Sequence, residues 1–273
     1  MQLPKRLILM AHTKYLRHMK LLFDDRLVEP NVRWLEDLRD VAYDTSWMNT
    51  APHVEAYFMY RDLYLTPEHR NVLMAHDLRY DITVIPPLKM GREYVKTLGH
   101  YHPHVVADVR YTYPELYEVL EGEAHYLLQR PHREHIERVD DVVVLQARQG
   151  DKVLVPPNYG HVTINPSEKA LKMANLVCRS FTSIYEPYKL LHGAVYYESV
   201  DGTFVQNRLY VQTPDIKLRR PVDVPELGLT KERPIYDLIE HPRQLEFLVA
   251  PQKYESFFNG LFDQTNQSLS SGT

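Results

Sequence analysis

Short patterns typical of β-strands dominate the middle of the chain. Between about residue 54 and residue 178, apolar residues alternate with polar ones or form short continuous runs, and Pro, Gly and Asp separate the segments. Examples are VEAYFMY, YDITVIPP, ELYEVLEGEAHYLLQR, DVVVLQA, HVTIN and ALKMANLVC. Strands at such intervals are typical of an all-β sandwich or barrel, and no long helical pattern interrupts them. The sequence therefore predicts an all-β fold.

The segments on either side of these strands have a different pattern. Toward the N-terminus, apolar residues recur at the spacing of one helix face, namely Leu16, Met19, Leu22, Phe23, Trp34, Leu35 and Leu38. We therefore expect a helical or irregular preface over residues 1–50. Farther along, Asp201-Gly202 lies between two runs of aromatic and β-branched residues, which is the pattern of a β-hairpin. The barrel is thus expected to cover residues 51–212.

The C-terminal part of the chain changes character again. After Pro214 the sequence is rich in proline and charge, and a weak helical pattern follows near residues 234–249. We expect residues 213–262 to form an extension that packs on the barrel. The final segment, DQTNQSLSSGT, is rich in Gln, Ser and Thr, and such segments bury too little apolar surface to offset the entropy lost on ordering. Residues 263–273 are therefore predicted to be disordered.

Composition narrows the classes of function. The 273 residues include 32 basic and 36 acidic ones, for a formal charge of −4, and no basic block is long enough to follow a nucleic acid. The longest apolar run near the start, LILM, is too short for a signal peptide or a membrane span. One cysteine, Cys178, agrees with a reducing compartment. We expect a cytoplasmic protein without nucleic-acid or membrane partners.

Histidines at every second position mark the candidate site. In TLGHYHPHVV, a strand over residues 92–102 would point His100 and His102 to the same side. In PELYEVLEG, alternation would turn Glu115 and Tyr117 inward together. The segment PPNYGHVTIN then delivers His161 at the beginning of another short strand. Three imidazoles and one carboxylate would meet inside the barrel.

This combination favours a metal site. Neutral imidazoles and a carboxylate on rigid strands suit a divalent first-row metal and leave coordination positions for substrate or water. Iron, manganese, nickel and zinc are all compatible with such a set of ligands. A third nearby histidine, His104, follows Pro103, which disturbs the strand where alternation would be needed. We expect His104 to lie outside the ligand set.

The same residues carry a resemblance to a known family. The motifs G-H-Y-H, E-x6-G from Glu115 to Gly122, and G-H-x3-N from Gly160 to Asn165 resemble the two cupin motifs. From about Trp34 to Cys178 the sequence is similar to those of the cupin-type glucose-6-phosphate isomerases of archaea and some bacteria. The resemblance implies a double-stranded β-helix, or jelly-roll barrel, and a homodimer that interconverts glucose 6-phosphate and fructose 6-phosphate. It also implies one divalent metal per subunit, Fe(II) first, with Mn, Ni or Zn as alternatives.

The resemblance assigns roles to individual residues. Its metal ligands correspond to His100, His102, Glu115 and His161. Its sugar-phosphate contacts correspond to Thr83, Thr97, Gly99 and Tyr117. Many relatives have a lysine immediately before the Gly-His pair, where this chain has Leu98, so Lys96 is the candidate substitute. Tyr185 is a looser counterpart of a tyrosine that relatives use after the last barrel strands.

Two mechanisms and two other functions stay open at this point. A metal at O1 and O2 of the sugar would support either proton transfer through a cis-enediol(ate) or a direct hydride shift. Glu115 would be the base in the first case, or a metal ligand only, and Tyr117 would hydrogen-bond the sugar or only pack. The alternative functions are a metal-dependent cupin dioxygenase or decarboxylase and a non-catalytic sugar-binding cupin.

Overall fold

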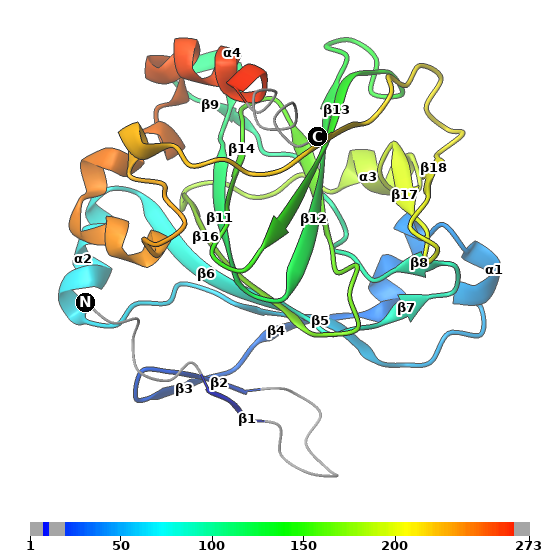
Figure 1. Ribbon diagram of the computed structural model, residues 1–273, viewed down its shortest axis with the longest axis horizontal. Helices are drawn as coiled ribbons and strands as arrows, with labels where there is room; N and C mark the ends of the chain where they lie inside the picture. The colour runs from blue at the N-terminus through cyan, green and yellow to red at the C-terminus, as the bar shows by residue number, and fades with distance from the viewer. Residues whose placement is uncertain (1–7, 11–19, 265–273) are drawn as a thin grey trace, which may run out of the picture.

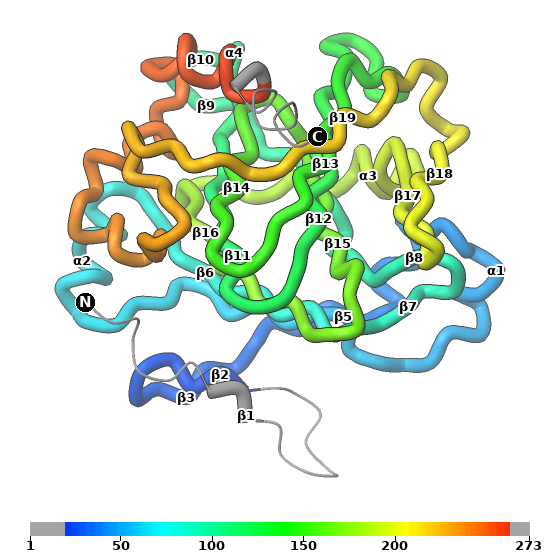
Figure 2. The backbone as a smooth tube through the Cα atoms, viewed as in Figure 1, coloured from blue at the N-terminus to red at the C-terminus, as the bar shows by residue number. Residues whose placement is uncertain are grey.

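Two facing β-sheets form the centre of the computed structural model, which describes residues 8–10 and 20–264 (Figures 1 and 2). The six-stranded sheet has the order β14 (Lys152–Val155), β11 (Glu115–Glu121), β16 (Leu171–Cys178), β6 (Leu78–Ile85), β5 (Glu55–Tyr60) and β4 (Asn31–Trp34). The four-stranded sheet has the order β15 (Gly160–Ile164), β12 (Glu123–Pro131), β13 (Val139–Arg148) and β19 (Lys217–Arg219). Neighbours in both sheets are antiparallel, except that β13 and β19 are parallel.

Smaller elements surround these sheets. The short strands are β1 (Ile8–Met10), β2 (Lys20–Phe23), β3 (Arg26–Val28), β7 (Lys89–Met90), β8 (Glu93–Tyr94), β9 (His104–Val105), β10 (Asp108–Thr112), β17 (Tyr196–Glu198) and β18 (Phe204–Gln206). The α-helices are α1 (Thr45–Met48), α2 (Pro67–Ala75), α3 (Glu186–Leu190) and α4 (Glu255–Gln264). The 3-10 helices are η1 (Leu35–Val41), η2 (Pro225–Leu227), η3 (Ile235–Glu240), η4 (Pro242–Leu248) and η5 (Pro251–Tyr254).

Strand β11 has apolar residues on both of its faces. Tyr117 and Val119 pack in the core between the two sheets, together with Tyr126 of β12. Leu116 belongs instead to a second apolar cluster, which joins the outer face of the six-stranded sheet to C-terminal residues such as Phe247. Both faces of this sheet are therefore buried. The structure confirms the predicted all-β barrel of two facing sheets, the double-stranded β-helix of cupins.

The N-terminal region differs from the prediction. The helical spacing is wrong for residues 20–34, which form strands β2, β3 and β4. In β2, Leu21 and Phe23 are buried in alternation, and Asp24, with φ +56°, turns the chain toward β3. The burial of alternate side chains stabilises a strand here, and this outweighs the weaker helical periodicity of the sequence. Leu16 and Met19 lie outside the described residues.

The two sheets also extend beyond the range predicted for the barrel. Strands β4 and β19 lie on either side of the predicted range 51–212, and each hydrogen-bonds to one of the two sheets. The predicted hairpin at Asp201-Gly202 is confirmed, since β17 and β18 pair across it. Helix α4 continues to Gln264, so the first two residues of the predicted disordered tail are helical; residues 265–273 lie outside the described residues. Among the described helices, none combines the length and apolar character needed to cross a membrane.

Candidate metal centre

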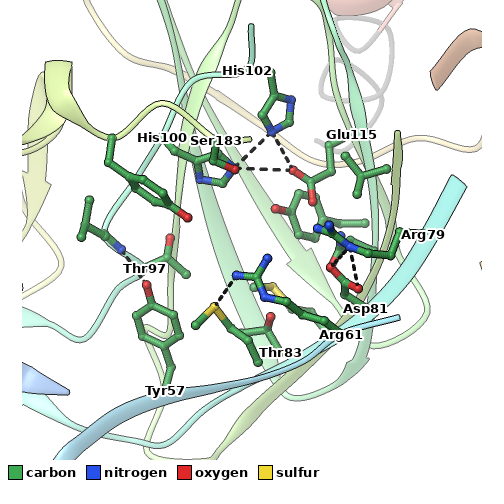
Figure 3. Close-up of a pocket in the computed structure, with 18 of the residues that line it drawn as sticks. Tyr57, Arg61, Arg79, Asp81, Thr83, Thr97, His100, His102, Glu115 and Ser183 are labelled. Atoms are coloured by element: carbon green, nitrogen blue, oxygen red, sulfur yellow. Dashed lines mark hydrogen bonds and ion pairs between the residues drawn. The ribbon is translucent and has the colours of Figure 1, made fainter. Parts of the chain in front are cut away.

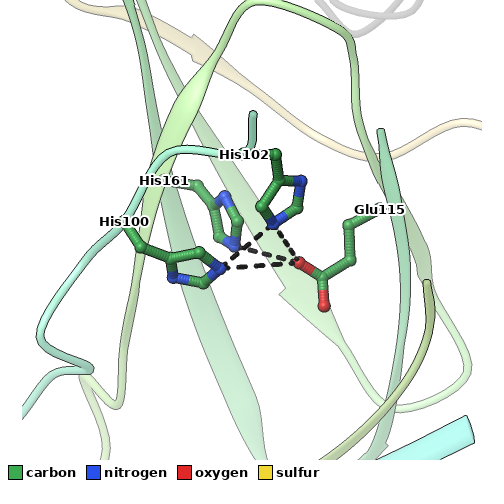
Figure 4. Close-up of side chains that lie close together, drawn as sticks. All are labelled: His100, His102, Glu115 and His161. Atoms are coloured by element: carbon green, nitrogen blue, oxygen red, sulfur yellow. Dashed lines mark hydrogen bonds and ion pairs between the residues drawn. The ribbon is translucent and has the colours of Figure 1, made fainter. Parts of the chain in front are cut away.

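The four predicted ligands meet beside the cavity shown in Figure 3, which His100, His102 and Glu115 line. Figure 4 shows the four side chains alone. His161 lies in β15, and its backbone pairs with that of His100 through two hydrogen bonds, one in each direction. His102 follows two residues after His100, and Glu115 is the first residue of β11. The predicted strand over residues 92–102 is limited to β8 (Glu93–Tyr94), and isolated bridges at His100 and Tyr101 hold the segment that carries the two histidines.

The ligand atoms are close enough to share an ion. One nitrogen or oxygen from each of His100, His102, Glu115 and His161 lies within 4.8 Å of all the others. Oε2 of Glu115 is 3.2 Å from Nε2 of His102, 3.3 Å from Nε2 of His161 and 3.9 Å from Nε2 of His100. The Nε2 atoms of His100 and His102 are 3.1 Å apart. His104, which was predicted to lie outside the ligand set, has an exposed side chain and does not join the cluster.

A backbone contact orients one of the imidazoles. Nδ1 of His102 lies 2.7 Å from the carbonyl oxygen of Tyr113, and a carbonyl accepts only an N–H. Nδ1 of His102 therefore carries a proton, so that in the neutral imidazole the lone pair is on Nε2, the nitrogen nearest the other ligands. Metal-binding histidines usually have such a hydrogen bond on the nitrogen that does not face the metal.

Burial sets the charges in the cluster. Burial, aided by the neighbouring imidazoles, lowers the pKa of His100 well below its ordinary value, and burial also lowers the pKa of His161. Burial by itself raises the pKa of the Glu115 carboxyl, but the adjacent imidazoles of His102 and His161 outweigh it and hold that pKa well below its ordinary value. These shifts favour neutral imidazoles at His100 and His161 and a carboxylate at Glu115, the forms that bind metals.

The chemistry of these donors fits a divalent ion. Oε2 of Glu115 is buried and accepts no hydrogen bond within the part of the chain that the structure describes, although three imidazole nitrogens surround it. A buried anionic oxygen without a donor is costly unless a cation neutralises it. Three nitrogens and one oxygen suit first-row metals such as iron, manganese, nickel or zinc. The cluster can therefore hold a metal.

Tyr117 lies next to this cluster. Its hydroxyl oxygen is 3.0 Å from Nε2 of His161. Burial, followed by the negative charge of Glu115, raises the pKa of Tyr117 well above its ordinary value. The phenol therefore keeps its proton and can donate a hydrogen bond to a group in the cavity. The two predicted catalytic residues, Glu115 and Tyr117, both line this cavity.

Most of the predicted sugar-phosphate contacts line the same cavity (Figure 3). Thr83 comes from β6, and Thr97 and Gly99 precede the first histidine ligand. Oγ1 of Thr97 accepts a hydrogen bond of 3.0 Å from the amide of Thr163, so its own hydroxyl hydrogen remains available. Tyr185 lines the cavity too, and its ring lies 5.6 Å from that of His100.

Lys96 is the exception, and its predicted place in the site is wrong. Its ammonium group is buried and contacts Oε2 of Glu93 at 2.5 Å, with the ring of Tyr197 on another side. Neighbours in an extended chain point in opposite directions, and Thr97 points into the cavity. Lys96 therefore faces away from it, and Glu93 already neutralises its charge.

The cavity also contains charged residues that the sequence reasoning missed. Arg79 and Asp81 lie on β6 at the same parity as Thr83, so alternation alone could have placed them beside it. Nε of Arg79 donates to both oxygens of Asp81, at 3.0 and 2.9 Å. Arg61 directly follows β5 and also lines the cavity. It has the same parity as Tyr57, another lining residue that the sequence reasoning missed. Asn175 of β16 completes this charged and polar wall.

Fold and site together define a class of protein. Two facing sheets with three histidines and a glutamate clustered beside a cavity are those of a cupin with a candidate metal centre. Residues 32–215 match the family described as Glucose-6-phosphate isomerase (GPI). The chain belongs to this family.

Individual relatives match a shorter region. The protein named glucose-6-phosphate isomerase from Thermococcus litoralis is 34% identical over 93 residues, which cover 34% of this chain and 42% of that protein. The protein of the same name from Pyrococcus furiosus is 33% identical over 89 residues, which cover 33% of this chain and 40% of that protein. The match thus spans less than half the length of these relatives.

Solved structures give weaker likenesses. Oxalate decarboxylase from Bacillus subtilis, in a structure at pH 4.6, aligns with 14% identity and a TM-score of 0.31, covering 47% of this chain and 26% of that one. A recombinant oxalate oxidase in complex with glycolate aligns with 13% identity and a TM-score of 0.32, covering 47% and 51%. At these scores neither likeness carries an argument about this chain.

Proposed function

We propose that this chain is a metal-dependent aldose–ketose isomerase that interconverts glucose 6-phosphate and fructose 6-phosphate. One observation supports this above the others. The buried three-histidine, one-glutamate cluster opens into the same cavity as Thr83, Thr97 and Gly99, the residues that the family resemblance assigns to the sugar phosphate. Metal ligands and neutral hydrogen-bond donors thus line one space, as an isomerase of sugar phosphates requires.

The chain's own residues supply the rest of the proposed mechanism. A divalent ion held by the four ligands would act as a Lewis acid at O1 and O2 of the sugar. All three contacts of Glu115 with imidazoles use Oε2, which leaves Oε1 to carry a proton between C2 and C1 on one face of a cis-enediol. Tyr117, protonated at neutral pH, would donate a hydrogen bond to a sugar oxygen.

The test of the activity uses metal reconstitution. Fructose 6-phosphate conversion is coupled to glucose-6-phosphate dehydrogenase, with protein stripped by a chelator and resupplied with iron, manganese, nickel or zinc. We expect turnover that depends on metal, that His161→Ala abolishes and that His135→Ala, a change at an exposed histidine, leaves intact. Stoichiometric metal binding without turnover on any metal would overturn the isomerase proposal; oxygen uptake would then test a dioxygenase, and sugar-phosphate binding without turnover a non-catalytic cupin.

A second experiment separates the two routes for the hydrogen. When the reaction runs in deuterated water, proton transfer by Glu115 predicts solvent deuterium at C1 or C2 of the product, because a carboxyl proton exchanges with solvent. Complete retention of the substrate hydrogen would exclude proton transfer and support a hydride shift.

The biological setting follows as further proposals. We propose Fe(II) as the native ion, since imidazole and carboxylate ligands suit it, and a role in glycolysis or gluconeogenesis in the cytoplasm.

We also propose a homodimer. The family resemblance implies it, and the exposed Val106 and Val109, at the β9–β10 hairpin and 96% and 72% exposed, are candidate contact residues. Light scattering of the purified chain tests the dimer, and a monomeric mass at micromolar concentration would contradict it.

A further inference from the structure

Arg61 places a cationic group in the cavity that no carboxylate neutralises directly. Figure 3 shows its side chain entering the cavity above Thr83. Within the described residues its one hydrogen bond goes to the thioether sulfur of Met59, at 3.2 Å, and no carboxylate oxygen lies within 4.0 Å. A thioether is a weak acceptor, and a guanidinium carries five N–H donors. Most of the donors of Arg61 are therefore free to bind a ligand.

The backbone turns directly after Arg61. Asp62 has φ +58°, in the left-handed region that Asp adopts more readily than most other non-glycine residues. Its amide donates to Oδ1 of Asp81 at 2.8 Å, and its carboxylate pairs with Arg179. The amide of the next residue, Leu63, donates to the carbonyl of Tyr80 at 2.8 Å. This turn fixes the direction in which Arg61 leaves β5.

Charge in the cavity points to a dianionic ligand. Asp81 neutralises Arg79, since Nε of Arg79 bonds both of its oxygens. A divalent ion beside the Glu115 carboxylate would leave one net positive charge, and Arg61 adds a second. A phosphate ester carries a charge between about −1.5 and −2 near pH 7. The remaining charge therefore matches a phosphorylated ligand only if Arg61 is counted.

We propose that Arg61 binds the phosphate group of the substrate and makes the cavity select phosphorylated over neutral sugars. This inference rests on the proposed isomerase function for the identity of the substrate. The sequence predicted that Lys96 would supply the cationic group, but Lys96 pairs with Glu93 and faces away from the cavity. The other candidate phosphate contacts, Thr83, Thr97 and Gly99, are neutral. Arg61 supplies the planar donor fork that suits phosphate oxygens.

The test compares Arg61→Gln, Arg61→Lys and a matched control in the metal-loaded protein. The control is Arg148→Gln, an exposed arginine paired with Glu123 outside the cavity. We expect Arg61→Gln to raise KM for fructose 6-phosphate at least about tenfold and to change kcat by less than about threefold, since binding rather than chemistry is lost. Orthophosphate binding, measured by calorimetry, should weaken to a similar extent. Arg61→Lys should recover part of both, and Arg148→Gln should match the unsubstituted protein.

The outcomes separate this inference from the proposed function. Unchanged KM and unchanged orthophosphate affinity in Arg61→Gln would overturn the role of Arg61 while leaving the isomerase in place. A loss of bound metal in Arg61→Gln would also overturn it, because the residue would then support the metal centre. Absence of turnover in the unsubstituted protein, together with orthophosphate and fructose 6-phosphate binding that depends on Arg61, would refute the isomerase and uphold Arg61 as a phosphate contact.

Discussion

His100 and His161 exchange backbone hydrogen bonds in both directions, at 3.2 and 3.1 Å. Two of the candidate metal ligands are therefore held side by side by main-chain contacts that do not involve their imidazoles. Removing one imidazole leaves this bridge intact. Loss of metal binding can thus be separated from loss of the fold.

His161→Ala should abolish stoichiometric metal binding without unfolding the chain. A ligand that binds only the folded state stabilises it by about 2.7 kcal/mol at one hundred times its dissociation constant. We expect saturating metal to raise the melting temperature of the chelator-treated protein and to have little effect on His161→Ala. Metal content and calorimetric melting with and without metal measure both. His135→Ala, at an exposed histidine, should behave like the unsubstituted protein, and retention of one ion by His161→Ala would exclude His161 from the ligand set.

Gly99→Ala should be strongly destabilising. Gly99 has φ +83°, and an added Cβ would lie 2.7 Å from the Tyr188 ring and 2.7 Å from a methyl group of Val162. Tyr188 is fully buried, so it has no room to move aside. Left-handed backbone costs a residue other than glycine about 1 to 2 kcal/mol and overpacking costs about 1 to 3 kcal/mol, so we expect a total of about 3 kcal/mol by urea unfolding.

Gly202→Ala is the matched control for this change. Gly202 has the same φ of +83° in the β17–β18 turn, but an added Cβ would meet nothing within 4 Å. Its cost, about 1 to 2 kcal/mol, isolates the backbone contribution. The difference between the two variants measures the contact with Tyr188 and Val162. Equal losses in both would show that the close approach at Gly99 relaxes without cost.

Alternation along strands explains how much of the site the sequence could predict. It places His100 beside His102 and turns Glu115 and Tyr117 to the same side, and the structure brings these side chains together. The same rule, applied from Thr83, would have found Arg79 and Asp81. Local periodicity is thus enough to place side chains whose strand and register are known.

Other features depend on contacts that a local pattern does not contain. The partner that draws Lys96 away from the cavity is a buried carboxylate, Glu93, and the turn that aims Arg61 is held by residues far along the chain, Asp81 and Arg179. Glu118 points out of the barrel, as alternation predicts, yet it is buried because the C-terminal segment covers that face. Such cases require the tertiary arrangement.

The buried pair of Glu118 and Lys152 should contribute to the polar anchoring of the C-terminal segment. Nζ of Lys152 lies 3.2 Å from Oε1 of Glu118 and also donates to the carbonyl of Lys231, while Oε2 of Glu118 accepts from the amide of Ile235. Glu118→Gln removes the charge and leaves Lys152 buried without its partner. Breaking a buried pair costs about 3 to 5 kcal/mol, and we expect the lower end because Lys152 keeps its carbonyl acceptors.

The neighbouring pair of Glu121 and Lys172 provides the comparison on the same strand. Its atoms are closer, at 2.9 Å, but the Glu121 side chain is 63% exposed, against 8% for Glu118. An exposed pair contributes at most about 1 kcal/mol because water screens it. Glu121→Gln should therefore change the free energy of unfolding far less than Glu118→Gln, although its distance is shorter. Equal losses in urea unfolding would mean that burial does not set the strength of these pairs, and that the C-terminal segment is anchored by its apolar contacts instead.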